Sequence, residues 1–192
     1  MEKFGYHKRD LLVSRVENAN ETQQETKEQF KSALEKFSTV LNFHGGKLQD
    51  KYEALNREFE SSEKKAAELT KRIDSIENVA EDLFAEWENE LSQYSNPSLK
   101  RSSEQKLRDT KSRYQPMIQA MRRAEKKVDP ILDAFRDQVL FLKHNLNAQA
   151  VASLKDEYAE VESDISVLIG DMEKSIKEAE QFISAMNATD AA

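Results

Sequence analysis

Apolar residues recur in the second quarter of the chain at alternating spacings of four and three, the pattern of a heptad repeat. The positions of this repeat are Leu48, Tyr52, Leu55, Phe59, Ser62, Ala66, Leu69, Ile73, Ile76, Ala80, Leu83, Trp87, Glu90 and Tyr94. Only Ser62 and Glu90 interrupt its apolar and small character. A repeat sustained over this length predicts a long helix that packs against other helices with a left-handed supercoil.

Three breaks divide the chain into four such segments. Paired glycines end the first segment at Asn42–Gly46, and Asn96 followed by Pro97 suits the cap and first residue of a new helix. A weaker break lies at His144–Asn147, with Asn147 as the cap. The predicted helices cover about 10–42, 47–94, 98–143 and 148–186.

Short connections make neighbouring helices antiparallel. The sequence therefore predicts an all-α fold, an elongated antiparallel four-helix bundle with up-down-up-down order, in which residues 1–192 form one domain. The chain has only 4 Gly and 3 Pro, so few turns are available to interrupt long helices. The second and third helices would each be roughly 70 Å long.

Folding the second segment onto the third about Asn96 places Phe59 opposite Phe135 and Trp87 opposite Leu107. The first segment has a polar middle, for which we expect looser packing. Pro116 and Pro130 fall inside the third segment, and each removes a helical hydrogen bond. They predict a bend or a break, and the sequence leaves both open.

Composition narrows the possible functions. The net charge of -7 argues against general binding of polyanions, and the lack of aromatic residues among the basic ones argues against nucleic acid as a partner. The absence of Cys excludes disulfides, thiolate catalysis and cysteine-ligated zinc. The longest stretch without a charged side chain, residues 144–154, is too short to span a bilayer.

The chain has 3 histidines, and none follows a Glu in the Glu-x-x-His pattern of di-iron bundles. His44 and His144 lie near predicted loops at the same end of the bundle and would be candidates for a shared metal. Solvated or capping histidines are the simpler interpretation. We therefore expect no catalytic residue, cofactor or metal, and a non-enzymatic protein.

Basic residues cluster where the second and third helices would cross at mid-length. They are Lys64, Lys65, Lys71, Arg72, Arg122, Arg123, Lys126 and Lys127. Such a basic belt would suit an anionic membrane or polysaccharide. The alternative, which we favour, is that carboxylates of the first and fourth helices neutralise it. The acidic stretch 74–90 is expected to pair with basic residues of the third helix, namely Lys106, Arg108, Lys111 and Arg113.

Two apolar groups need a separate interpretation. Because the first helix is predicted to cover only about 52–80 of the second, the turn between the second and third helices would project from the bundle. Its exposed apolar residues would be Trp87, Leu91, Tyr94 and Leu99, a possible contact with a membrane surface or a partner. The run Val139–Leu142 is instead predicted to be buried on several sides.

Four stretches, residues 2–16, 42–46, 120–125 and 134–148, resemble a bacterial family catalogued as domain of unknown function 2959. The resemblance spans nearly the whole chain and is most specific at 135–148. The family has no established activity, so the resemblance implies no catalytic residues. Its members look like secreted lipoproteins, which implies the periplasm or cell envelope; neither a signal nor a lipid-bearing Cys is present in this sequence, and the cytoplasm is the alternative.

These observations favour a rigid helical spacer or scaffold that acts through a protein partner or self-association. The alternative is a peripheral binder of anionic membrane or polysaccharide through the basic belt. Heptad repeats do not distinguish helices that pack within one chain from helices that pack between two, so the oligomeric state stays open.

Overall fold

The computed structural model describes residues 2–190, and the side chains of residues 7–188. This part of the chain is helical and contains no strand. Its helices are α1 (Glu2–Leu41), α2 (Leu48–Leu91), α3 (Pro97–Glu125), α4 (Val128–His144), α5 (Ala148–Ser153) and α6 (Lys155–Asp190). The predicted all-α class is confirmed.

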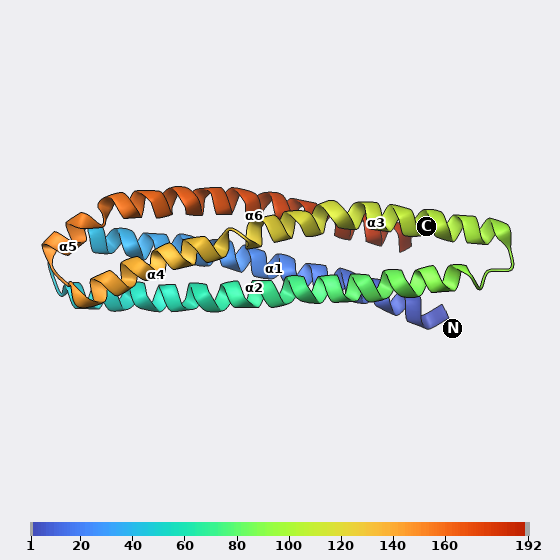
Figure 1. The fold of residues 1–192 in the computed structure, drawn as a ribbon, viewed down its shortest axis with the longest axis horizontal. Coiled ribbons are helices and arrows are strands. Elements are labelled where there is room, and N and C mark those ends of the chain that lie inside the picture. The colour runs from blue at the N-terminus through green and yellow to red at the C-terminus, as the bar shows by residue number, and fades with distance from the viewer. Residues whose placement is uncertain (1, 191–192) are drawn as a thin grey trace.

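The helices lie side by side along one axis and form a rod (Figure 1). The four predicted segments correspond to α1, to α2, to α3 with α4, and to α5 with α6. α1 packs against α2 and α6, and the α3–α4 segment also packs against α2 and α6. In the described chain α1 lies diagonally opposite the α3–α4 segment, and α2 diagonally opposite α6, with no Cα atoms of these pairs within 8 Å of each other. The segments therefore surround one core in a ring.

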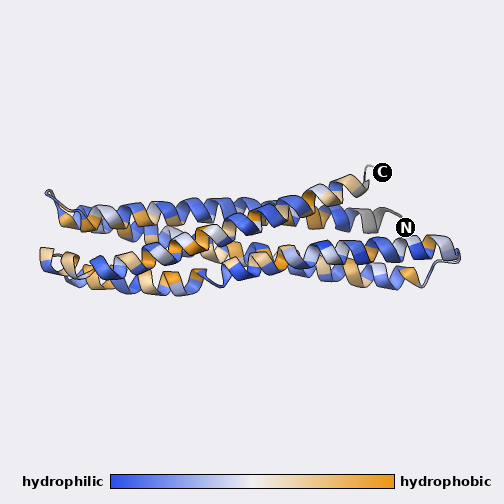
Figure 2. Ribbon diagram, turned by 90° about the horizontal axis from the view of Figure 1, so that it is seen from above, coloured by the Kyte–Doolittle hydropathy of each residue, from blue (hydrophilic) through white to orange (hydrophobic). Residues whose placement is uncertain are grey.

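Buried apolar side chains from all four segments form one continuous core, and the ribbon in Figure 2 shows apolar residues recurring along each helix among hydrophilic ones. Near one end, the ring of Phe135 stacks on Phe37 at 5.6 Å and meets Phe59 edge-on at 5.5 Å between centroids. The Phe59–Phe135 contact confirms the register predicted between the second and third segments.

The third segment is two helices. α3 continues through Pro116 and ends at Glu125, whereas α4 begins at Val128, so that Pro130 falls in its first turn. A proline is tolerated there because the first N–H groups of a helix have no partner within that helix. Lys126 and Lys127 keep right-handed helical dihedrals, so the chain continues in nearly the same direction.

Both asparagine caps and the glycine turn form as predicted. The Asn96 side chain accepts from the backbone N–H of Ser98 at 2.9 Å, and the Asn147 side chain accepts from that of Ala150 at 2.9 Å. Gly46 has φ +94°, which lies in the left-handed region that favours glycine.

The first helix is longer than predicted, because it begins at Glu2 rather than near residue 10. Lys8 forms an ion pair with Glu86, and the Arg9 guanidinium lies 5.9 Å from the centre of the Trp87 ring. α1 therefore reaches the level of Trp87 on α2. The prediction that its cover would end near residue 80 was wrong.

The polar middle of α1 is buried rather than open. Thr22, Gln23 and Thr26 are 3%, 0% and 0% exposed. Both threonine hydroxyls donate to the backbone carbonyl four residues earlier, but Gln23 Oε1 has no hydrogen-bond partner. Ser175 Oγ on α6 is likewise buried without a partner. A polar layer thus interrupts the apolar core at mid-length.

The run Val139–Leu142 is buried on one side only. Val139 and Leu142 are 3% and 0% exposed, as expected. Leu140 and Phe141 are 49% and 41% exposed, so the prediction of burial on several sides was wrong for them. The core needs only one stripe of α4, and adjacent residues on a helix point in different directions.

Candidate interaction surfaces

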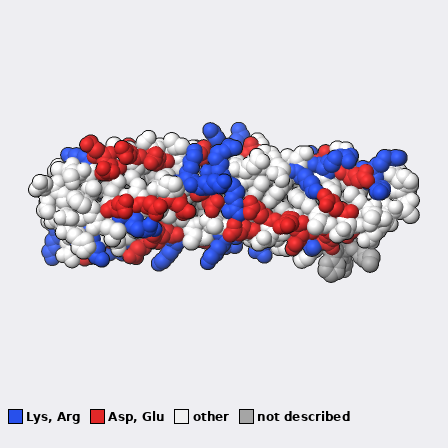
Figure 3. All heavy atoms as spheres, viewed as in Figure 1, with Lys and Arg blue, Asp and Glu red and all other residues white. Residues whose placement is uncertain are grey.

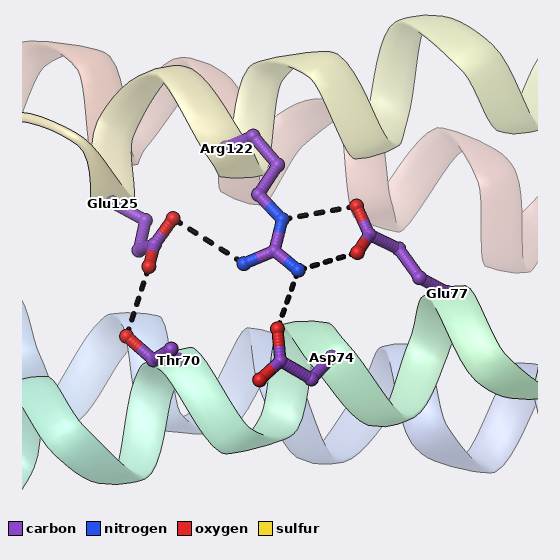
Figure 4. A network of polar contacts seen from close by, with 5 residues as sticks. All are labelled: Thr70, Asp74, Glu77, Arg122 and Glu125. Atoms are coloured by element: carbon purple, nitrogen blue, oxygen red, sulfur yellow. Dashed lines mark hydrogen bonds and ion pairs between the residues drawn. The ribbon is translucent and has the colours of Figure 1, made fainter.

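The centre of the predicted basic belt is an ion-pair network around Arg122 (Figure 4). Arg122 on α3 donates from Nε to Glu77 at 2.9 Å and from a terminal nitrogen to the second oxygen of Glu77, both across to α2. It also binds Asp74 at 2.5 Å and Glu125 at 3.3 Å. The hydrogen bonds to Glu77 and Asp74 raise the pKa of Arg122 above its usual range. Three carboxylates therefore surround one guanidinium, and the belt is not uniformly cationic.

Carboxylates of the outer segments neutralise two further members of the belt. Lys65 pairs with Glu25 of α1, and also with Glu68 on its own helix at 2.9 Å. Lys127 pairs with Asp171 of α6. Hydrogen bonds to Glu25 and Glu68 raise the pKa of Lys65, and the bond from Lys65 lowers that of Glu68.

Arg72 forms an ion pair with Glu68 at 3.6 Å, and both residues lie on α2. In all, four of the eight predicted belt residues have a carboxylate partner. The favoured alternative, neutralisation by the first and fourth segments, thus holds for Lys65 and Lys127 but does not extend to every cation.

Other cations remain solvent-exposed without an ion pair in the described part of the chain. Four of them were predicted for the belt: Lys64, Lys71, Arg123 and Lys126. Sequence reasoning missed Lys174 and Lys177 on α6, which are also exposed and unpaired there. Aligning the third segment with the fourth would have placed them near Lys127. Figure 3 shows basic side chains gathered near the middle of the rod, where α3 gives way to α4.

The predicted hairpin tip is partly buried. Tyr94 and Leu99 are 42% and 57% exposed, whereas Trp87 and Leu91 are half-buried. Trp87 Nε1 donates to Ser103 Oγ at 2.8 Å, and this bond holds the indole between α2 and α3. The side chain is therefore a packed residue and not an exposed anchor.

An open cavity of about 430 Å³ adjoins the indole at this end of the rod. Its lining includes the aromatic side chain of Tyr94 and charged side chains from three helices, among them Arg9, Glu90 and Lys106. Cations and carboxylates face the same space, so its electrostatics favour neither an anion nor a cation.

A family model described as "Protein of unknown function (DUF2959)" matches residues 1–186. The chain belongs to this family. No curated protein matches it.

In this DUF2959 protein the acidic stretch of α2 pairs partly as expected. Glu88 binds Lys111 of α3, and Glu77 and Asp74 bind Arg122. Glu86 binds Lys8 of α1, a partner that the sequence did not indicate. The pairs with α3 agree with the antiparallel register deduced from the heptads.

His44 and His144 of the DUF2959 protein are both exposed. Among the residues that the structure describes, no three or more His, Asp or Glu side chains lie close enough together to hold a metal ion. None of the described helices combines the length and the apolar character needed to cross a membrane.

Proposed function

We propose that this DUF2959 protein is a non-enzymatic rigid spacer or scaffold in the bacterial envelope. The observation that supports this role is the continuous core, in which buried side chains from Leu12 to Met186 join all four segments. Aromatic contacts occur at two separate levels, Phe37–Phe135 towards one end and Tyr114–Phe182 towards the other. A close-packed core of this kind resists bending and transmits position from one end of the rod to the other.

Rigidity can be tested with spin labels, since the chain contains no Cys that would label in competition. Ser98→Cys and Gln149→Cys place labels at exposed positions near opposite ends of α3 and α5. A rigid rod gives one narrow distance distribution near 70 Å, estimated from the helical rise. The pair Lys51→Cys with Asn89→Cys on α2 is the control for a single helix. A broad distribution for the first pair alone would contradict the spacer role.

The envelope placement is supported by the family resemblance alone. Fractionation of cells that express the full gene from its own start tests it directly. Recovery with periplasmic or membrane fractions is expected, and recovery only with a cytoplasmic marker would remove this part of the proposal.

A second candidate function is peripheral binding to an anionic membrane or polysaccharide. It is favoured by the exposed cations Arg123, Lys126, Lys174 and Lys177, none of which has an ion pair in the described chain. Binding of this kind weakens steeply with salt. Vesicles of anionic lipid and a sulfated polysaccharide are suitable probes, and absence of binding to both at low salt would eliminate this function.

A further inference from the structure

The ion pair between Lys127 and Asp171 marks the side of the rod on which α4 and α6 meet. Residues at spacings of three, four or seven from Asp171 lie on the same side of α6, because these spacings return to one helix face. The exposed residues that follow this rule, directly or by repeating it, include Glu157, Glu160, Asp164, Val167 and Lys174. We call the surface that they form with the neighbouring side of α4 the α4–α6 face.

Charge is separated along this face. Glu157, Glu160 and Asp164 precede Val167, and Lys174 follows it. None of these four charged residues has an ion pair in the described chain. Figure 3 shows the same order, with acidic side chains over the first half of α6 and basic ones near the middle of the rod. Val167 lies between the two groups and is 52% exposed.

Glu160 and Lys174 are placed symmetrically about Val167, seven residues before it and seven residues after it. If two α6 helices pack antiparallel about a two-fold axis at Val167, each Glu160 meets Lys174 of the other copy. An isologous interface requires this kind of self-complementarity.

The neighbouring α3–α4 segment has the same symmetry at the same level of the rod. Pro130 follows Lys127 by three residues and Val167 precedes Asp171 by four, so the two lie near one level of these antiparallel helices. Arg123 is seven residues before Pro130 and Asp137 seven after it. Both are exposed without an ion pair in the described chain. The two-fold axis that pairs the α6 charges therefore also brings Arg123 opposite Asp137.

The surface between these charges suits close contact. A side chain added at Gly170 in the middle of α6 would meet nothing within 4 Å, so packing inside the chain does not explain the glycine. A glycine on an exposed helix lets a second backbone approach closely. The face from Glu157 to Lys174 is about 25 Å long and two helices wide, which gives roughly 500 Å² on each copy, the size of a weak or transient interface.

We propose that a second copy of this chain packs antiparallel on the α4–α6 face, with a two-fold axis at Val167. The contact joins the two rods along this face and pairs Glu160 with Lys174, and Arg123 with Asp137, of the other copy. It does not depend on the spacer role, because a rigid rod that stays monomeric would refute the pairing and leave the spacer role intact.

Sedimentation equilibrium of the full chain tests the pairing through charge reversal. Glu160→Lys brings like charges together at two places in the dimer and should raise the dissociation constant at least about tenfold. Adding Lys174→Glu to the same chain restores opposite charges at both places, so the double variant should return to within about threefold of the wild type. Val167→Arg, at the axis, should abolish the dimer. Circular dichroism confirms that each variant remains helical.

Glu180→Lys is the matched control, because Glu180 is exposed on α6 seven residues from Glu173, which faces Lys27 of α1. It should leave the dissociation constant unchanged. A wild-type chain that remains monomeric at about millimolar concentration would overturn the proposal, as would equal effects of Glu160→Lys and Glu180→Lys. A monomer that binds a sulfated polysaccharide, and loses this binding with Lys174→Glu, would assign the cations to polyanion binding instead.

Discussion

Arg122 on α3 and Glu77 on α2 share a two-point ion pair, in which two guanidinium nitrogens donate to the two carboxylate oxygens. The Arg122 side chain is only 24% exposed, so water screens the pair less than it screens a surface pair. The same guanidinium also holds Asp74 and Glu125. It is the one cation bound to three carboxylates among the described ion pairs.

Arg122→Ala should therefore lower the free energy of unfolding by about 1–3 kcal/mol, because charged hydrogen bonds are lost and three carboxylates are left close together. Urea denaturation followed by circular dichroism measures the change. Arg123→Ala is the matched control: Arg123 is exposed without an ion pair in the described chain, and its loss should change stability by less than about 0.5 kcal/mol. Equal losses in the two variants would contradict a stabilising role for the network.

Gln23→Leu should stabilise the protein. Gln23 is fully buried and its Oε1 has no hydrogen-bond partner, so replacing it with an apolar side chain of similar size removes a desolvation penalty. We expect a gain of about 1 kcal/mol in the free energy of unfolding.

Gln29→Leu is the control on the same helix. Gln29 donates to the Glu58 carboxylate at 2.8 Å and to its carbonyl at 3.2 Å, so this variant should be neutral or destabilised. A loss of stability in Gln23→Leu would indicate that the buried amide is satisfied, for instance by an internal water molecule.

Much of the fold follows from local sequence rules. The heptads of the second and third segments predict the contact of Phe59 with Phe135, and Asn96 predicts the start of α3. The extension of α1 could not be predicted, because its support is the contact of Lys8 and Arg9 with side chains far away in sequence. The sequence does not distinguish a bend from the break before α4, because a proline is compatible both with a bent helix and with a helix start.

The candidate surfaces were less predictable than the fold. Pairing within one hairpin follows from a turn and a heptad, and the predicted pairing of the acidic stretch with Lys111 is observed. The pairs of Arg122 with Asp74 and Glu77 were not predicted, because Arg122 was assigned to the basic belt. The partners of Lys65 and Lys127 depend on which segments are neighbours around the ring. The alignment of the second segment with the third does not contain this information, and Lys174 and Lys177 were missed because the fourth segment was not aligned with the third.

Alkaline pH should destabilise the protein partly through Tyr114. Burial raises the pKa of this phenol above the value of about 10 that is usual for tyrosine. As pH rises, the unfolded chain therefore loses this proton before the folded chain does. Unfolding then releases a proton, so the free energy of unfolding falls as pH rises above about 10, by at most roughly 1.4 kcal/mol per pH unit.

Tyr114→Phe should make this fall shallower. The raised pKa values of Lys8 and Lys65 act in the same direction and form a background common to both proteins. Urea denaturation between about pH 9 and 11.5 compares the two slopes, with the range chosen around the unfolded pKa. Parallel curves for the wild type and the variant would show that the phenol does not contribute.

Trp87→Ser distinguishes a packed indole from an exposed membrane anchor. Trp87 is half-buried, and its indole N–H donates to Ser103 Oγ at 2.8 Å. The Arg9 guanidinium lies 5.9 Å from the centre of the ring. Its removal should lower the free energy of unfolding by about 1–3 kcal/mol, less than for a fully buried tryptophan.

Leu99→Ser is the control, since Leu99 lies at the same end of the rod and is 57% exposed. Its replacement should change stability by less than about 0.5 kcal/mol. Because Trp87 is the only tryptophan, circular dichroism rather than fluorescence must follow the unfolding of both variants. If Trp87→Ser changed the free energy of unfolding as little as Leu99→Ser, the contact between α1 and this end of α2 would contribute little to stability. The indole would then be a candidate contact for a partner or a lipid surface.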